Sequence, residues 1–238
     1  MANPYFQFKK FTVYHERSAM KVTTDACLFG AWTADALKKE HAQGVLLDIG
    51  TGTGLLSLMV AQKNNLQIDA VEINPAAAKE AEGNIIDSPF KERIYVHQVD
   101  IALFEKSNYD YIICNPPFYE NELISPSVDK NIAHHSHQLK WIDLFQIIHN
   151  KLNAKGYFYL LLPFKRKEEA ENGLLNQGLF ITTIVAVKQT PNHAPFRIII
   201  KGSKNKKALH EAIIIIKDEH DQYTPEFTSL LKDYYLYL

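Results

Sequence analysis

The stretch from Val45 to Gln62 is the feature that most limits the folds open to this chain. It begins with the apolar run VLLDI, continues into the glycine-rich turn GTGTG and ends in an apolar segment of helical length. A buried strand, a tight glycine turn and a helix form the first half of a βαβ unit. The next apolar run, Ile68 to Glu72, supplies the returning strand. We therefore predict an α/β fold on a doubly wound, mostly parallel sheet.

Further strands and helices alternate along the rest of the chain. Strands are predicted in 93–97, 110–114, 157–163, 180–187, 196–201 and 212–217, and helices in 74–84, 141–152 and 165–176. We expect the last two strands to be antiparallel, because short loops connect them in place of crossover helices. Residues 1–40 are predicted as an N-terminal hairpin and helix cap, and residues 41–238 as the main body of the same domain.

Composition narrows the functional classes. The chain has 238 residues and 46% hydrophobic content, enough for one large domain, and its net charge of −1 gives no overall signature of nucleic-acid binding. Any polyanion must therefore meet a local basic patch. Cys27 and Cys114 lie among apolar neighbours, which indicates reduced thiols rather than a disulfide. Because no apolar run approaches the length of a membrane span or a signal core, we expect a cytoplasmic protein, and we expect a monomer.

A second constraint is the turn that ends the apolar run from Asp110 to Cys114. Asn115 is followed by two prolines and Phe118. Because prolines cannot donate to a ladder, the strand ends here, and ligands of open parallel sheets bind just beyond such strand ends. The Asn115 amide oxygen and the Pro116 carbonyl offer two acceptors for one NH₂ group, and Phe118 offers a ring to stack on a flat heterocycle. The alternative, a turn that merely ends a strand, is weakened by the nearby glycine-rich stretch.

The glycine spacing argues for one class of cofactor. A nicotinamide-dinucleotide fingerprint would place its third glycine at Leu55, whereas the pattern here is Asp-x-Gly-x-Gly-x-Gly from Asp48 to Gly54. That pattern resembles the first motif of S-adenosylmethionine-dependent methyltransferases. Glu72 then falls where a carboxylate accepts both ribose hydroxyls. Asp100 either caps a turn or accepts from the cofactor's adenine amine, and methyltransferase architecture favours the second.

These motifs occur in the order found in class I methyltransferases that act on amino groups, a Rossmann-like fold with a seven-stranded sheet. The opening segments FKKF, HER and MKVTTD and the closing YYL resemble the bacterial tRNA (adenine-37) methyltransferases that modify valine tRNA. The resemblance implies S-adenosylmethionine as cofactor, tRNA as partner and catalysis by Asn115, Pro116 and Phe118. The cofactor residues that it implies are Lys21, Thr24, Asp25, Asp48, Gly50, Gly52, Glu72, Asp100 and Asn115.

Basic residues supply candidates for contact with RNA phosphates. Lys201, Lys204, Lys206 and Lys207 fall within one short run, which is either a solvated loop or a phosphate-binding patch. Further candidates are Lys165, Arg166, Lys9 and Lys10.

The polar segment 119–139 is long for a connection, and we expect a substrate-gripping element there. Its histidines, His134, His135 and His137, lack a partnering cysteine or carboxylate pattern, so we expect no metal.

Two alternatives stay open. The NPPF turn is shared with DNA adenine methylases, and NPP[FY] with protein glutamine methyltransferases, so another NH₂ substrate in rRNA, DNA or protein is possible. The glutamine family resembles two-domain chains with a helical front domain, which the first 40 residues here do not supply. A non-catalytic RNA-binding module of the same fold would bind RNA without consuming cofactor.

Overall fold

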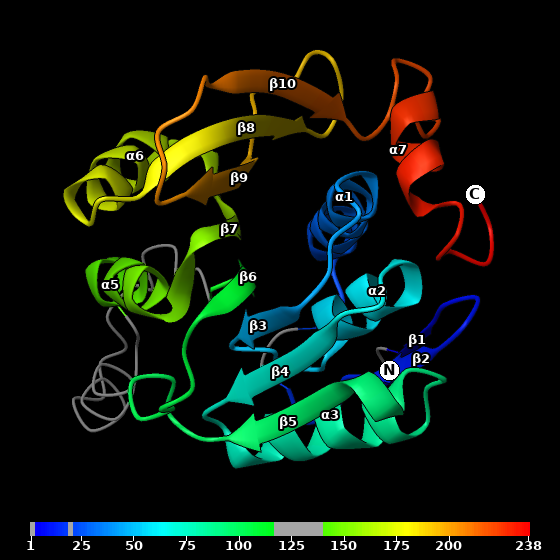
Figure 1. The fold of residues 1–238 in the computed structure, drawn as a ribbon. Helices are drawn as coiled ribbons and strands as arrows, with labels where there is room; N and C mark the ends of the chain where they lie inside the picture. The colour runs from blue at the N-terminus through cyan, green and yellow to red at the C-terminus, as the bar shows by residue number, and fades with distance from the viewer. Residues whose placement is uncertain (1–2, 19–20, 117–139) are drawn as a thin grey trace, which may run out of the picture.

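The centre of the protein is a parallel-rich sheet with helices on both faces (Figure 1). The computed structural model describes residues 3–18, 21–116 and 140–238. In these residues the main sheet has eight strands, in the order β10-β8-β9-β7-β6-β3-β4-β5. The strand bounds are β3 Val45–Ile49, β4 Gln67–Glu72, β5 Ile94–Gln98, β6 Tyr109–Cys114, β7 Leu152–Pro163, β8 Phe180–Lys188, β9 Arg197–Ser203 and β10 His210–Ile215. The predicted doubly wound α/β fold is confirmed.

Helices cover the sheet on two sides because its central strands are apolar in both directions. Leu46 belongs to the hydrophobic cluster on one face and Leu47 to the cluster on the other, as expected from the two-residue period of a strand. The first face carries α1 Thr24–Lys39, α2 Leu55–Lys63, α3 Pro75–Ile86 and α7 Pro225–Leu231, and the second carries α5 Trp141–Lys151 and α6 Lys167–Asn176. Two short 3₁₀ helices, η1 Lys91–Arg93 and η2 Phe164–Arg166, join elements.

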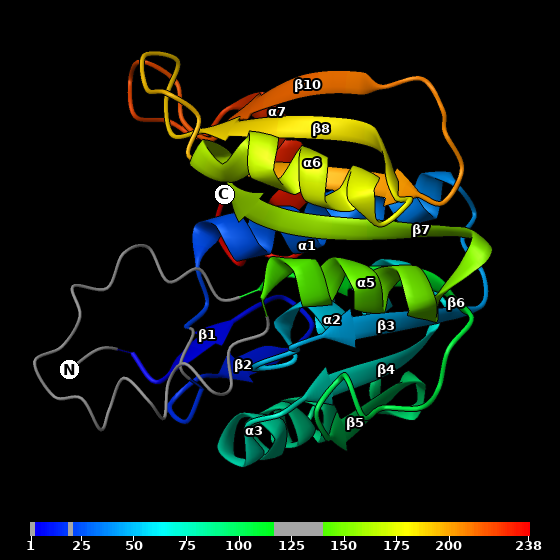
Figure 2. The same cartoon turned by 90° about the vertical axis from the view of Figure 1, so that its left-hand side faces the viewer.

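The central strand β3 lies where the winding of the sheet reverses. It pairs in parallel with β4 on one side and β6 on the other, so that Ile49 stands opposite both Val71 and Cys114. We call the edge at which these strands end the carboxyl rim, and the opposite edge the amino rim. Figure 2 shows the carboxyl rim on the left, where the arrowheads of β7 and β8 point. Gly50, Glu72 and Asn115 therefore meet at the position where doubly wound sheets bind ligands.

Two details of the sheet differ from the sequence-based expectations. The expected antiparallel arrangement is correct for β9, which lies between β7 and β8, but wrong for β10, which pairs in parallel with β8. The loop after β9 carries the chain past the beginning of β8 at the amino rim, so β10 runs in the same direction as β8. This added edge strand also brings the sheet to eight strands where seven were expected.

The N-terminal segment packs against the main body. The predicted hairpin consists of β1 Tyr5–Gln7 and β2 Thr12–Tyr14. Asn84 of α3 accepts from the Tyr14 N–H and donates to the carbonyl oxygens of Tyr14 and Thr53, each at 2.9 Å. One buried amide thus joins the hairpin to the glycine turn.

Both cysteines are buried and unbonded to each other, as expected. None of the helices in the described residues is long and apolar enough to cross a membrane.

Candidate active site

The glycine turn after β3 leaves open space at the carboxyl rim. Gly50 and Gly52 have φ values of +67° and +57°, a region that side chains rarely adopt. A Cβ built on either residue would meet no heavy atom of the described structure within 4 Å. The described residues therefore leave the space beside these two glycines unfilled, and a ligand can approach the backbone there.

Asp48 lies directly beneath this turn with no exposed surface. Its Oδ2 accepts hydrogen bonds from the hydroxyls of Thr51 and Ser57, both at 2.7 Å, whereas its Oδ1 is buried without a partner among the described residues. Burial raises the pKa of Asp48 to about 6 against those two hydrogen bonds, and the nearby Glu72 raises it further. A buried carboxylate that keeps one oxygen unpaired is suited to a cationic ligand.

Glu72, at the end of β4, is oriented by two backbone groups. Its Oε2 accepts from the Gly52 N–H at 3.0 Å and its Oε1 from the Asn74 N–H at 2.8 Å. Each oxygen still has a free lone pair, because a carboxylate oxygen accepts two hydrogen bonds. The geometry gives Glu72 the capacity to accept from two neighbouring hydroxyls.

Asn115 follows the end of β6, beside the glycine turn. Because Ile49 pairs with Cys114, the residues that leave β3 and β6 emerge side by side. The Asn115 Oδ1 atom is buried and has no hydrogen-bond partner among the described residues. Pro116 is buried, and Phe118 lies outside the described residues. An unpaired amide oxygen in a water-poor position at the carboxyl rim is the acceptor that the sequence predicted.

Asp100 follows β5 at the same rim. Its Oδ1 accepts from the Ala102 N–H at 2.9 Å, and its carbonyl accepts from Leu103 and Phe104. The turn-capping role is therefore observed. The second carboxylate oxygen is not used by this turn, so the expected contact with an adenine amine stays compatible with it.

The N-terminus of α1 is fixed by an ion pair that the sequence did not reveal. Asp25 accepts from the Ala26 N–H at 3.1 Å and from Arg197 Nε, at the start of β9, at 2.8 Å. Because 172 residues separate the partners, no local pattern indicates the pair. Lys21 and Thr24 are exposed nearby. A carboxylate already engaged by Arg197 orients the helix N-terminus rather than receiving an anion itself.

The predicted basic run lies at the amino rim, away from Asn115. Lys201 of β9 is 8% exposed and forms an ion pair with Glu40, so its charge is used inside the protein. Lys204 donates to the Leu152 carbonyl at 2.7 Å, and burial lowers its pKa.

Lys206 is exposed on the same loop, and Lys207 contacts the hydroxyl and ring of Tyr157. The run is thus partly structural.

The other basic candidates are dispersed. Arg166 stacks 3.6 Å from the centre of the Trp141 ring and pairs with Glu169, while Lys165 is exposed just beyond β7 at the carboxyl rim. Lys9 donates to the Lys232 carbonyl at 2.6 Å, which ties the hairpin turn to the C-terminal segment, and Lys10 beside it is exposed.

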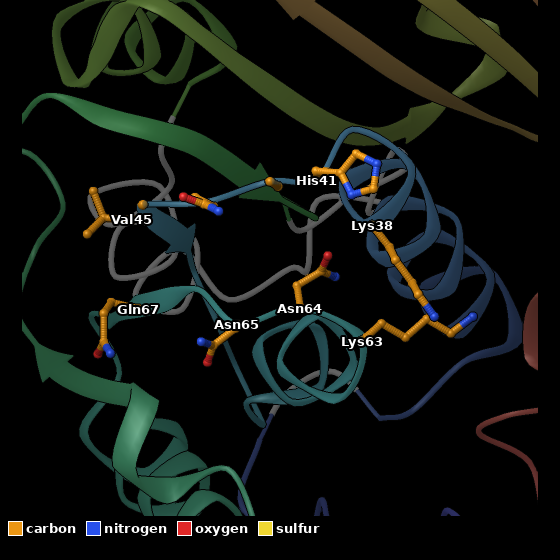
Figure 3. Close-up of a pocket in the computed structure, with 10 residues that line it drawn as sticks. Lys38, His41, Val45, Lys63, Asn64, Asn65 and Gln67 are labelled. Atoms are coloured by element: carbon orange, nitrogen blue, oxygen red, sulfur yellow. The ribbon is translucent and has the colours of Figure 1, made fainter.

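A hollow of about 730 Å³ lies at the amino rim, where β3 and β4 begin (Figure 3). Lys38 and Lys63 line it, each in the last turn of its helix, where a cation offsets the negative end of the helix dipole. A structural role accounts for both.

In the part of the chain that the structure describes, no group of three or more His, Cys, Asp or Glu side chains could hold a metal. His134, His135 and His137 lie outside it.

Comparison with known proteins agrees with this geometry. Residues 31–159 match the family described as Methyltransferase small domain. The chain is 38% identical over 240 residues to the tRNA1(Val) (adenine(37)-N6)-methyltransferase of Parabacteroides distasonis, which covers 99% of both chains, and 38% identical over 239 residues to that of Phocaeicola vulgatus, again covering 99% of both. The fold is similar to that of a predicted O-methyltransferase from Agrobacterium tumefaciens, with a TM-score of 0.67 at 18% identity, covering 88% of this chain and 96% of that one. The chain therefore belongs to the family of tRNA1(Val) (adenine(37)-N6)-methyltransferases.

Proposed function

We propose that this enzyme transfers a methyl group from S-adenosylmethionine to the exocyclic amine of an adenine in tRNA, adenosine-37 beside the anticodon of valine tRNA. The observation that carries the proposal is the buried, unpaired Asn115 Oδ1 beside the glycine turn. The relatives from Parabacteroides distasonis and Phocaeicola vulgatus are named for this activity. An amide acceptor at this position suits an NH₂ group on the substrate.

The residues at the carboxyl rim fit the cofactor. S-adenosylmethionine carries a sulfonium, an ammonium group and a ribose, and it supplies an electrophilic methyl when bound. The unpaired Oδ1 of Asp48, with the open backbone of Gly50 and Gly52, would hold the amino-acid part. Glu72 would accept from the ribose hydroxyls and Asp100 from the adenine amine. The carboxylates of Asp48 and Glu72 lie close enough to interact, and two such groups favour a ligand with positive charge.

The amide turn would align the substrate rather than remove a proton by itself. Asn115 Oδ1 and the Pro116 carbonyl accept the two N–H groups of the substrate amine, which directs the nitrogen lone pair at the methyl group. Transfer would form the nitrogen–carbon bond as the methyl–sulfur bond of the cofactor breaks, leaving S-adenosylhomocysteine. Both acceptors would stabilise the positive charge that develops on the nitrogen, and the proton would then leave to water. Neither is a strong base. Phe118 keeps its predicted role as the ring that stacks on the extruded base.

The approach of RNA follows from where the acceptors lie. Asn115 lies at the carboxyl rim, so the extruded base would enter there. Lys165 is a predicted phosphate-contacting residue on that rim. Lys204, Lys206 and Lys207 lie at the other rim. Their sequence-based assignment to RNA remains a prediction, which a salt-dependence experiment can decide.

The test is mass analysis of nucleosides from valine tRNA of a strain that lacks the protein, together with methylation of that tRNA by the purified enzyme. We expect N6-methyladenosine at position 37 to be absent from the strain and restored in vitro. Methylation of another RNA, of DNA or of a protein glutamine instead would reject valine tRNA as the substrate. Binding of tRNA without consumption of S-adenosylmethionine would favour the non-catalytic alternative.

A further inference from the structure

A buried ionic network lies beneath the segment that carries Asp100. Its centre is Asp69 of β4, which is 5% exposed. The carboxylate of Asp69 meets His97 Nε2 at 2.7 Å, Lys106 Nζ at 2.5 Å and the Tyr109 hydroxyl at 2.8 Å. These partners come from β5, from the segment between β5 and β6, and from β6. One carboxylate thus joins three pieces of chain around the candidate adenine-binding turn.

The network reaches Asp100 through Phe104. The Phe104 ring packs on His97 with 4.9 Å between ring centres, and the Phe104 N–H donates to the Asp100 carbonyl at 3.0 Å. Lys151 of α5 also donates to the carbonyl oxygens of Phe104 and Lys106. The segment is therefore held by two charged side chains, Asp69 and Lys151, from separate elements of the fold.

The charges of this network suit a fixed structure. Burial alone would raise the pKa of Asp69, but the hydrogen bonds from Lys106, His97 and Tyr109 outweigh it and lower that pKa. Burial and the neighbouring Asp69 raise the pKa of Tyr109, which keeps its hydroxyl protonated as a donor. A charged carboxylate with three donors is satisfied only while the segment stays in place. Moving the segment would leave a buried charge under-solvated.

We propose that Asp69 and Lys106 are positioning residues for cofactor binding: their ion pair holds the segment 99–106 so that the free oxygen of Asp100 meets the cofactor's adenine. The proposal rests on the proposed function, in which Asp100 contacts that adenine. Neither residue touches the cofactor. Their effect is exerted through the position of Asp100.

Lys106 is the residue to test, because its side chain is 52% exposed and its replacement creates no cavity. We expect Lys106→Met to weaken S-adenosylmethionine binding about fivefold to tenfold in calorimetry, the scale of one ordinary hydrogen bond. Lys106→Arg should restore affinity, because it keeps the cation. Lys91→Met, which removes an exposed lysine from η1, is the matched control and should bind normally.

A double-mutant cycle separates positioning from general stabilisation. If Lys106 acts through Asp100, then Lys106→Met should change affinity by less than twofold in an Asp100→Asn background. A purely structural role would lower the melting temperature of the free enzyme and leave affinity unchanged, and that result would overturn the proposal. Fully additive losses would overturn it as well.

The two hypotheses fail differently. Normal affinity in Lys106→Met with weakened binding in Asp100→Asn would reject the positioning role and leave the proposed function intact. Normal affinity in Asp100→Asn would reject the adenine contact, and the positioning role with it. No binding of S-adenosylmethionine by the unmodified enzyme would reject the proposed function itself.

Discussion

Asp48, within β3, and Asn115, directly after the neighbouring parallel strand β6, each keep a buried Oδ1 atom without a hydrogen-bond partner among the described residues. Unpaired buried acceptors cost free energy, on the order of 1–3 kcal/mol each, which a bound ligand can offset. Their chemistry differs, because Asp48 is a carboxylate suited to a cation and Asn115 a neutral amide suited to an NH₂ group. In the proposed function, the cofactor and the substrate would thus have separate acceptors on adjacent strands.

Asn115 should affect turnover far more than cofactor binding. We expect Asn115→Ala to lower the single-turnover rate of tRNA methylation by about 100-fold, by analogy with the loss of one aligned group in an oxyanion hole. Although the resemblance also places Asn115 among the cofactor residues, we expect S-adenosylmethionine affinity, measured by calorimetry, to change little, because in the proposed function the amide oxygen accepts from the substrate.

The matched control for that variant is Asn65→Ala, which removes an exposed amide at the amino rim and should methylate normally. An Asn115→Ala enzyme that methylates adenine at nearly the unmodified rate would remove this turn from the active site.

Asp48 should trade stability for cofactor binding. Its pKa is raised in the folded protein to about 6 from an ordinary value of 3.8, so the folded state holds its proton more tightly than the unfolded state. The stability that this group contributes is therefore fully present below pH 3.8 and is lost as pH rises to about 6. Asp48→Asn avoids this loss. At pH 7 we expect the cofactor-free variant to be more stable than the unmodified enzyme, by at most about 3 kcal/mol of unfolding free energy. Its melting temperature should be higher accordingly.

The same substitution should abolish tight binding of S-adenosylmethionine. For the unmodified enzyme, affinity should rise with pH through about 6 as Asp48 ionises. Calorimetry between pH 5 and pH 8, with roughly half-unit steps, measures this dependence. If Asp48→Asn binds S-adenosylmethionine as well as the unmodified enzyme does, the carboxylate does not serve the cofactor.

The sequence indicates the centre of the candidate site better than its supports. Asp48, Gly52, Glu72 and Asn115 are singled out because glycine turns and strand ends leave local patterns, and their roles stay predictions. Asp25 with Arg197, and Asp69 with Lys106, were not, because each pair forms between distant segments whose residues look like ordinary surface charges. Such pairs exist only once the strand order is known.

The prediction that β10 is antiparallel was wrong for a related reason. A short connection usually joins antiparallel neighbours, and the sequence carries no sign that the chain passes β8 before it pairs. The lysine run shows the same limit of local patterns. Its composition does not reveal that Lys201 forms an ion pair with Glu40, and contact of the run with RNA stays a prediction.

Glu72 should control cofactor affinity without a selective effect on RNA. Glu72→Gln keeps the size of the side chain but replaces one accepting oxygen by an NH₂ group. In the unmodified enzyme the Gly52 N–H donates to Glu72, and in the variant the NH₂ group would face that donor. We expect S-adenosylmethionine binding to weaken roughly tenfold, equal to about 1.4 kcal/mol. Glu92→Gln, an exposed glutamate on η1, is the matched control. Unchanged cofactor affinity in Glu72→Gln, or an equal loss in Glu92→Gln, would contradict the ribose contact.

The salt dependence of tRNA binding should distinguish the two rims. Each phosphate contact contributes about 0.7–0.9 to the slope of log affinity against log salt. In the proposed function the extruded base enters at the carboxyl rim. Lys165→Ala should therefore reduce the magnitude of that slope by about 0.7–0.9, the contribution of one phosphate contact. The joint replacement of Lys204, Lys206 and Lys207 by alanine should leave it unchanged, since that loop lies at the amino rim and Lys204 and Lys207 contact the protein itself. Filter binding at several salt concentrations measures both variants, with calorimetry of S-adenosylmethionine to confirm an intact cofactor site. A flattened slope in the triple variant, with a normal slope in Lys165→Ala, would instead place the RNA across the amino rim and support the original assignment of the lysine run.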